Sequence, residues 1–373
     1  MTPHAREPVG TQPLPCDVFD LTLSENPFPP LPSVLESVNA SLRRANRYPE
    51  FLPHRLPAVI AAHLGVDTDR VVVGAGATGV VLQIMQTVSG PGRQMVFASP
   101  TFDGYPIMAA MAGLESVAVP LDSSGEQNFA AMARAVGERT ALVAVCRPHN
   151  PTGTVPAAAE LRAFLPAVPR HVPVILDEAY VEFLAEDERV DTCELVARHP
   201  NLLVLRTFSK AYGLAGLRIG YAFGAPEQIA RIRRLQLPFG TPEYAVEAVR
   251  ACYAASAELA GRIRDIAAER EGLRTALRRR GIDVPRSRGN FLYLPGPGVH
   301  AALASAGIAA KGYRDGSARI AVGDPRAGIA VLHAFDGWSG SGRPGRAGHD
   351  ESIARWPVRQ PHGCPGTGTC SGR

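Results

Sequence analysis

Short apolar runs alternate with helical segments between residues 70 and 205, and this alternation restricts the possible folds more than any other feature. The apolar runs, each about as long as one strand, occupy residues 70–73, 94–98, 115–119, 141–146, 172–176 and 202–205. Strands that are buried on both faces have this continuously apolar character. The segments between them have helical composition and occupy residues 79–88, 104–112, 129–136 and 157–168. The pattern predicts an α/β domain with a mostly parallel sheet covered by helices.

A smaller α+β unit is predicted after this domain. Helical composition extends from Pro242 to about Arg280. Strands are expected at 290–294, 308–310 and 318–322, with helices at 299–306 and 327–335. We therefore expect four parts: an N-terminal arm with a small-domain segment (1–46), a large domain (47–241), a long linking helix with a small C-terminal domain (242–336), and a disordered tail (337–373).

Composition argues against several classes of function. The chain has 373 residues, 46% of them hydrophobic, and a formal net charge of +4, which gives no support to nucleic-acid binding. No apolar run is long enough to span a bilayer, and the N-terminus lacks the apolar core of a signal peptide. The six scattered cysteines are typical of reduced thiols in a cytoplasmic protein. Cys364, Cys370 and His362 match no zinc-ligand spacing, so we expect no metal site.

A lysine follows the last of these apolar runs, in the segment Thr207-Phe-Ser-Lys210. A desolvated lysine loses its proton readily and forms a Schiff base with an aldehyde. Ser209 and Arg218 beside it suit a phosphate group, and the small residues of 211–216 let a flat group approach the backbone. Pyridoxal 5′-phosphate (PLP) carries both an aldehyde and a phosphate. The segment therefore indicates a PLP site, with a solvated surface lysine as the alternative.

Other polar residues also lie where predicted strands end. The glycine-rich turn at 74–79 opens a helix and suits an anion, although such turns are also common without any ligand. Asp177 follows the run 172–176, and a carboxylate beside a pyridine nitrogen keeps that nitrogen protonated, which makes the ring an electron sink. Asn150 and Tyr180 are placed to hydrogen-bond the ring oxygen. Arg319 suits the α-carboxylate of an amino acid, with an exposed edge-strand arginine as the alternative.

In this combination and order, the chain resembles the fold-type I PLP-dependent aminotransferases, specifically the histidinol-phosphate aminotransferase family with its aromatic (phenylalanine) relatives. The resemblance spans about residues 23–335 and is most specific at 150–154, 177–183 and 206–221. It implies that Lys210 forms the Schiff base and acts as the general base, and that Asp177 pairs with the ring nitrogen.

The resemblance also implies roles for residues that the local pattern leaves open. The implied ligands of PLP are Ala77, Thr78, Phe102, Asn150, Asp177, Tyr180, Ser209, Lys210 and Arg218. Tyr48 would reach the phosphate in the neighbouring subunit, which implies a homodimer with shared sites. Asn26 and Arg319 would face the substrate, and Leu23, Phe28, Phe239 and Tyr313 are candidates for lining its side-chain end.

The implied reaction is amino transfer from a donor, expected to be glutamate, to a keto acceptor. Histidinol phosphate and imidazole-acetol phosphate are the first expectation, which would place the enzyme in histidine biosynthesis. Aromatic or specialised amino acids are the alternative, and a PLP-dependent decarboxylase or a non-catalytic binding module is a remote one. Departures from the family pattern leave the substrate open: Arg147-Pro-His149 replaces Asn-Pro-Asn, and the loop 238–243 is unusual.

Overall fold

The computed structural model describes residues 19–338. The arm before residue 19 and the tail after residue 338, with Cys364, Cys370 and His362, lie outside the described residues.

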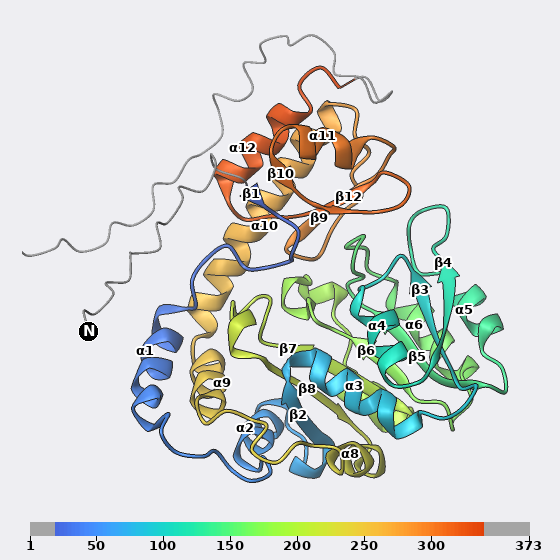
Figure 1. Ribbon diagram of the computed structural model, residues 1–373, viewed down its shortest axis with the longest axis vertical. Coiled ribbons are helices and arrows are strands. Elements are labelled where there is room, and N and C mark those ends of the chain that lie inside the picture. The colour runs from blue at the N-terminus through green and yellow to red at the C-terminus, as the bar shows by residue number, and fades with distance from the viewer. Residues whose placement is uncertain (1–18, 339–373) are drawn as a thin grey trace, which may run out of the picture.

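A seven-stranded sheet forms the centre of the larger lobe (Figure 1). Its strands, from one edge to the other, are β2 (Val71–Ala75), β8 (Ile219–Gly224), β7 (Leu202–Thr207), β6 (Val174–Asp177), β5 (Thr140–Cys146), β3 (Gln94–Ser99) and β4 (Glu115–Pro120). Strand β8 is the only one of the seven that runs in the opposite direction to the others. The predicted α/β fold with a mostly parallel sheet is therefore confirmed. The reversal at β8 arises because the connection from β7 carries no crossover helix, which a parallel return would need.

Helices cover both faces of the sheet. One face packs against α3 (Gly76–Val88), α4 (Gly104–Met111) and α8 (Pro226–Arg233). The other packs against α2 (Arg55–Leu64), α5 (Phe129–Ala135), α6 (Ala158–Phe164), α7 (Thr192–Arg198) and α9 (Tyr244–Ala254), and α1 (Pro32–Ser41) packs on α9 in the same hydrophobic cluster. From Leu142 to Cys146, successive residues of β5 alternate between the two hydrophobic clusters, since side chains along a strand point to opposite faces. Both faces of β5 are therefore buried, as its continuously apolar sequence predicts.

The smaller lobe surrounds its own hydrophobic core (Figure 1). An antiparallel sheet is ordered β11 (Lys311–Gly312), β12 (Ala318–Ala321), β9 (Phe291–Leu294), with helices α10 (Ser256–Arg279), α11 (Val299–Ser305) and α12 (Pro325–Ala334). The N-terminal strand β1 (Phe19–Asp20) pairs in parallel with β10 (Ile308–Ala309). The segment after β1 thus runs from the smaller lobe towards the larger one. Short 3₁₀ turns occur at Leu42–Arg44, Thr68–Arg70, Leu165–Ala167, Val181–Phe183, Glu186–Glu188 and Ala215–Leu217.

The helical stretch expected from 242 to about 280 forms as two helices that meet at Ala255. Helix α9 packs its apolar face into the core of the larger lobe, whereas the buried residues of α10 include Ile266, Leu273 and Leu277, which belong to the smaller core. The break thus lies where the chain passes from one core to the other. No proline or glycine marks it. Helices α7 and α8 also form where no helix was predicted.

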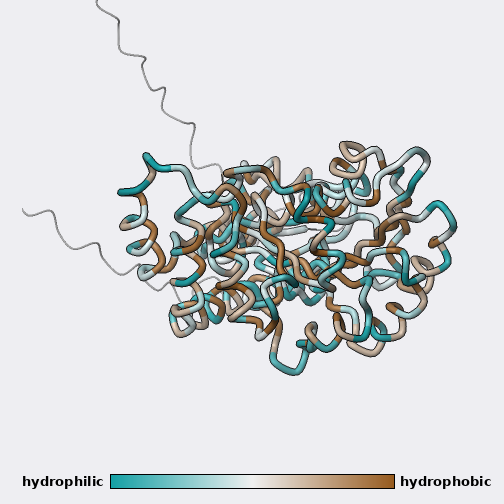
Figure 2. Tube along the Cα trace, turned by 90° about the horizontal axis from the view of Figure 1, so that it is seen from below, coloured by the Kyte–Doolittle hydropathy of each residue, from teal (hydrophilic) through white to brown (hydrophobic). Residues whose placement is uncertain are grey.

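Hydrophobic segments run through the body of the molecule and hydrophilic loops project at its edges (Figure 2). Within residues 19–338, no helix is both long enough and apolar enough to cross a membrane.

Candidate active site

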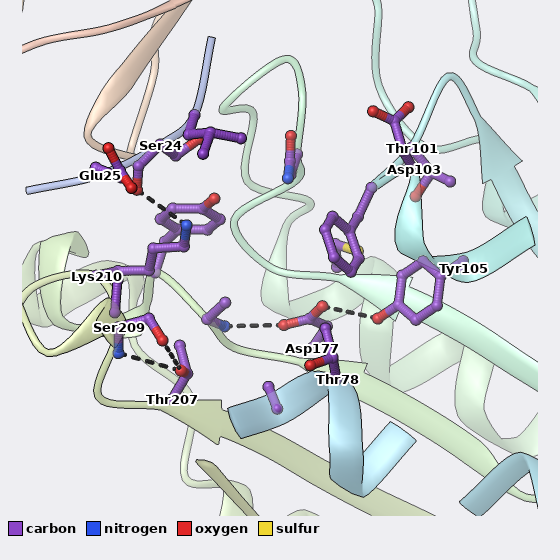
Figure 3. A pocket seen from close by; sticks show the side chains of 18 of the residues that line it. Ser24, Glu25, Thr78, Thr101, Asp103, Tyr105, Asp177, Thr207, Ser209 and Lys210 are labelled. Carbon is purple, nitrogen blue, oxygen red and sulfur yellow. Dashed lines mark hydrogen bonds between the residues drawn. The ribbon is translucent and has the colours of Figure 1, made fainter. Parts of the chain in front are cut away.

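Three loops meet at the carboxyl ends of β5, β6 and β7. Because these strands are parallel, their carboxyl ends lie along one edge of the sheet. Asn150 follows β5, Asp177 is the last residue of β6, and Lys210 follows β7. With segments of the smaller lobe, they line a cavity of about 550 Å³ (Figure 3).

Asp177 is held between two donors (Figure 3). Its Oδ2 accepts a hydrogen bond from the Tyr105 hydroxyl at 2.7 Å, and its Oδ1 accepts one from the Ala179 N–H at 3.0 Å. Burial raises the pKa of the Asp177 carboxyl, while these hydrogen bonds and the positive charge of Lys210 act in the opposite direction. Burial also raises the pKa of Tyr105 well above its usual value, so the phenol remains a donor. A buried carboxylate in this setting would be stabilised by a protonated pyridine nitrogen placed beside it.

Lys210 lies under the N-terminal segment. Its Nζ donates to the Ser24 carbonyl at 2.9 Å and lies 5.7 Å from the centre of the Tyr180 ring. The chain contains two lysines, Lys210 and Lys311, and both line this cavity. Since a Schiff base with an aldehyde needs a primary amine, both lysine amines of the chain are placed at one site.

The start of α3 and Arg218 form one end of the cavity. Helix starts carry free N–H groups, and the first turn of α3 has no acidic residue to occupy them. Arg218 has a left-handed backbone (φ 53°), and its Nη2 donates to the Thr78 hydroxyl at 3.2 Å. A Cβ at Gly76 would lie 2.3 Å from that Nη2, so only glycine permits this approach. The free amides beside a guanidinium suit a phosphate.

Arg319 of β12 reaches across from the smaller lobe. Its Nη1 donates to Asn150 Oδ1 at 2.7 Å, and its Nη2 donates to the Thr22 carbonyl at 2.7 Å. Its Nε is buried and has no hydrogen-bond partner among residues 19–338. A buried guanidinium with no carboxylate partner here suits an anionic ligand.

Sequence comparison decides the family to which this site belongs. The model of the family described as aminotransferase class I and II matches residues 16–325, which is most of the chain. The chain belongs to this family. Aminotransferases of this family depend on PLP, so the fold and the cofactor suggested by the sequence are confirmed.

Several relatives of this aminotransferase share most of its length. The aromatic amino acid aminotransferase of Streptomyces coelicolor is 41% identical over 318 residues, covering 84% of this chain and 89% of that protein. The enzyme of the same name from Rhodococcus jostii is 40% identical over 343 residues, covering 89% and 95%. Among solved structures, the histidinol-phosphate aminotransferase of Sinorhizobium meliloti in complex with pyridoxal 5′-phosphate has a TM-score of 0.78 at 27% identity, covering 85% of this chain and 89% of that chain. The Thermus thermophilus aspartate aminotransferase with maleate, at 23% identity and a TM-score of 0.76, covers 86% and 91% and shares the fold.

The residues of this aminotransferase suit PLP at three points. Lys210 would supply an amine for the aldehyde, Asp177 a carboxylate for the ring nitrogen, and the start of α3 with Arg218 a donor set for the phosphate. The Thr207 hydroxyl donates to Ser209 Oγ at 3.0 Å and accepts from the Ser209 N–H at 3.1 Å, which orients that side chain (Figure 3).

Ten of the twelve residues expected at the site line the cavity of this aminotransferase. They are Ala77, Thr78, Phe102, Asn150, Asp177, Tyr180, Ser209, Lys210, Arg218 and Arg319. Leu23 and Tyr313, expected at the substrate end, also line it.

Two expected site residues lie elsewhere. The Asn26 amide donates to the carbonyls of Lys210 and Ala211 at 3.1 Å each, so it anchors the N-terminal segment to the lysine loop instead of facing the cavity. Tyr48 is 83% exposed and packs against Phe239 on the outer surface. Since Tyr48 was expected to reach the phosphate of a neighbouring subunit, its position outside the cavity of its own subunit leaves that prediction open.

The two expected substrate-end residues that remain also lie outside the cavity. Phe239 belongs to the surface contact just described, and Phe28 lies under the guanidinium of Arg262 beside the smaller core. Phe239 is 43% exposed and Phe28 is partly buried against the smaller core, so neither lines the cavity of its own subunit.

Other residues that line this cavity were not among the expected site residues, and Tyr105, Thr207 and Lys311 are examples. Tyr105 lies in an apolar helical segment and looks like a core residue, because nothing local indicates that its hydroxyl meets Asp177. Thr207 ends an apolar strand, and Lys311 stands in a short segment without any motif. Residues that reach a site through tertiary packing leave no local periodicity to detect.

Of the segment Arg147-Pro-His149, which replaces Asn-Pro-Asn, Pro148 lines the cavity, whereas the two replaced residues lie beside it. Arg147 Nε donates to the Pro156 carbonyl at 3.0 Å, and its Nη2 donates to the Glu188 carbonyl at 2.6 Å. His149 Nδ1 lies 2.9 Å from the Thr152 hydroxyl, and the ring is fully buried. Both residues brace the turn that carries Asn150.

We expect His149 to make the protein acid-sensitive. Burial lowers the pKa of its imidazole from 6.5 to about 3. Above pH 6.5 the ring is neutral in both the folded and unfolded states and contributes no pH dependence. As the pH falls below 6.5, only the unfolded state takes up the proton, so the free energy of unfolding drops by about 2 kcal/mol at pH 5.

His149→Asn should remove this pH dependence. Urea unfolding at pH 7.5 and pH 5.0 measures the loss of stability on acidification, which should be smaller in the variant by about 2 kcal/mol. The difference between the proteins at pH 7.5 separately measures the packing lost with the ring. An equal loss on acidification in both proteins would show that His149 takes up its proton while folded.

Proposed function

We propose that this aminotransferase acts on aromatic amino acids and their 2-oxo acids, with a dicarboxylic amino acid such as glutamate as the second substrate. The observation that carries this proposal is the 41% identity, over most of both chains, to the aromatic amino acid aminotransferase of S. coelicolor. The S. meliloti histidinol-phosphate enzyme is 27% identical. This comparison supports the alternative substrate over histidinol phosphate, which was the first expectation from the sequence.

The lining of the cavity is consistent with an aromatic side chain. Leu23 of the N-terminal segment, Phe102 before α4 and Tyr313 of the smaller lobe all contribute to it. Tyr313 packs edge-on against Tyr293, with ring centres 5.5 Å apart, which fixes its position. An apolar and aromatic wall of this kind favours an uncharged planar side chain.

Each polar residue has a separate proposed role. PLP, when bound, supplies the electron sink for the bond that breaks at the substrate Cα. Lys210 Nζ would take the proton from the substrate Cα and deliver it to the carbon of the cofactor's aldehyde group, two atoms away. Asp177 holds a proton on the ring nitrogen, and Arg319 binds the α-carboxylate. Asn150 and Tyr180 hold the ring oxygen, and the N-terminal segment over Lys210 excludes water from the proton transfer.

We also propose a homodimer. Tyr48, Phe51 and Phe239 form an exposed aromatic cluster, with Phe239 at 4.8 Å and 5.2 Å from the other two ring centres. Leu237, which is 72% exposed, extends this apolar surface. Exposed apolar patches of this kind mark interaction surfaces. Sedimentation velocity should show a dimer that Tyr48→Asp weakens, and a stable monomer in the wild type would reject the proposal.

The function is tested through each half of the reaction. The PLP-loaded enzyme is mixed separately with phenylalanine, tyrosine, glutamate and histidinol phosphate, and the loss of the cofactor's yellow absorbance is followed with time. We expect the aromatic amino acids to react most efficiently. Preferential reaction of histidinol phosphate would overturn the substrate proposal, and release of CO₂ would indicate decarboxylation.

A further inference from the structure

An ion pair joins the two lobes beside the cavity. Lys311 of β11 lies 2.7 Å, Nζ to Oδ2, from Asp103, which precedes α4. Both residues line the cavity, with side-chain exposures of 36% and 58%. Lys311 comes from the smaller lobe and Asp103 from the larger one, so the contact bridges the cavity from wall to wall.

Asp103 is free for this role because it does not cap its helix. It stands at the N-cap of α4, where aspartate usually accepts an N–H of the first turn, yet its side chain accepts none. The other carboxylate at the mouth of the cavity, Glu25, lies near Lys210, on the opposite side of the view from Asp103 (Figure 3). Asp103 is therefore the carboxylate that balances Lys311.

Lys311 is also a neighbour of the arginine proposed to bind the substrate anion. Lys311 and Arg319 are directly paired across β11 and β12, which places their side chains on the same face of the sheet. Both line the cavity. The end of the cavity where the substrate anion is proposed to bind thus contains two cations, Lys311 and Arg319, and one carboxylate, Asp103, which leaves one net positive charge.

We propose that Asp103 is a specificity-determining residue that sets this end of the cavity for a monoanion. An α-carboxylate carries one negative charge, and Arg319 alone can match it. A phosphate monoester carries nearly two above its second pKa of about 6, so it needs both cations. Asp103 neutralises Lys311 and adds a negative charge near the ligand, which disfavours the dianion. This inference rests on the proposed action on amino acids and explains how an enzyme of this fold would reject amines that carry a phosphate ester.

The test compares two amino donors with the same aromatic side chain, in which Cα carries either a carboxylate or a phosphate ester on a methylene group. Phenylalanine and O-phosphophenylalaninol are used as amino donors for the PLP-loaded enzyme, and the ratio of their kcat/KM values is measured at pH 8. For Asp103→Asn, removing one charge beside the ligand should shift the ratio towards the phosphate ester by roughly tenfold. Adding Lys311→Gln should reverse that shift. Glu115→Gln, which breaks the exposed Arg139–Glu115 pair far from the cavity, is the matched control and should leave the ratio unchanged.

A binding measurement makes the test independent of turnover. The dissociation constants of 3-phenylpropionate and 2-phenylethyl phosphate, which cannot react, are measured by calorimetry with the same proteins. Their ratio should shift in the same direction in Asp103→Asn. If the wild type does not convert phenylalanine but the binding ratio shifts, the proposed function fails and the role of Asp103 stands. An unchanged ratio in both assays, or a wild type that prefers the phosphate ester, overturns the role of Asp103.

Discussion

Lys210→Ala is expected to lower the rate of amino transfer by at least roughly a thousandfold, because the variant loses the general base at the substrate Cα and the amine that attaches the cofactor. The fold should persist. The Nζ makes one hydrogen bond, to the Ser24 carbonyl, and losing it costs about 1 kcal/mol. Steady-state rates with phenylalanine and the unfolding midpoint measure the two effects separately.

The scarcity of lysines makes this prediction unusually direct. Lys311 is the only other lysine in the chain, and it is paired with Asp103. Borohydride reduction of the PLP-loaded enzyme, followed by peptide mapping, should place the cofactor on Lys210 in the wild type. A wild-type rate in a clean preparation of Lys210→Ala, or the cofactor found on Lys311 in the wild type, would contradict the assignment.

Asp177→Asn is expected to lower the rate by roughly a thousandfold or more, because a neutral amide cannot hold a proton on the ring nitrogen and the ring loses its strength as an electron sink. Asparagine preserves the shape of the side chain beside Tyr105, so the effect is one of charge and not of packing. Single-turnover rates with phenylalanine measure it, together with the shift of the cofactor's absorbance.

Two variants of neighbouring residues provide references against which the effect of Asp177→Asn is compared. Tyr105→Phe removes only the 2.7 Å hydrogen bond to Asp177 and should cost roughly tenfold to a hundredfold, as expected for a bond to a charged group. Glu178→Gln alters the next carboxylate, which does not line the cavity and lies 2.8 Å from Arg206, Oε2 to Nη2. This change should reduce stability more than turnover. If Asp177→Asn were no more harmful than Glu178→Gln, the proposed pairing with the ring nitrogen would be wrong.

The course of the chain through the sheet follows closely from its apolar pattern. Continuously apolar segments have no polar face to expose, so they become central strands, and their parallel order gathers the residues after β5, β6 and β7 at one edge. The sequence alone therefore assigns Asn150, Asp177 and Lys210 to one site. It does not locate the boundary between α9 and α10, because that boundary depends on which of two cores each helix packs against.

Local sequence by itself determined the chemistry available at the site: an amine and a carboxylate at or just after the ends of strands, free amides at the start of a helix, and guanidinium groups. Only the tertiary structure decided how these groups are partnered. Tyr105 meets Asp177 across 72 residues, and Lys311 meets Asp103 across an even longer separation. Packing also turned Asn26 to the backbone of the lysine loop and left Tyr48 exposed. The physical reason is that a residue type and its place in an element are local properties, whereas a contact between distant residues exists only after both lobes have packed.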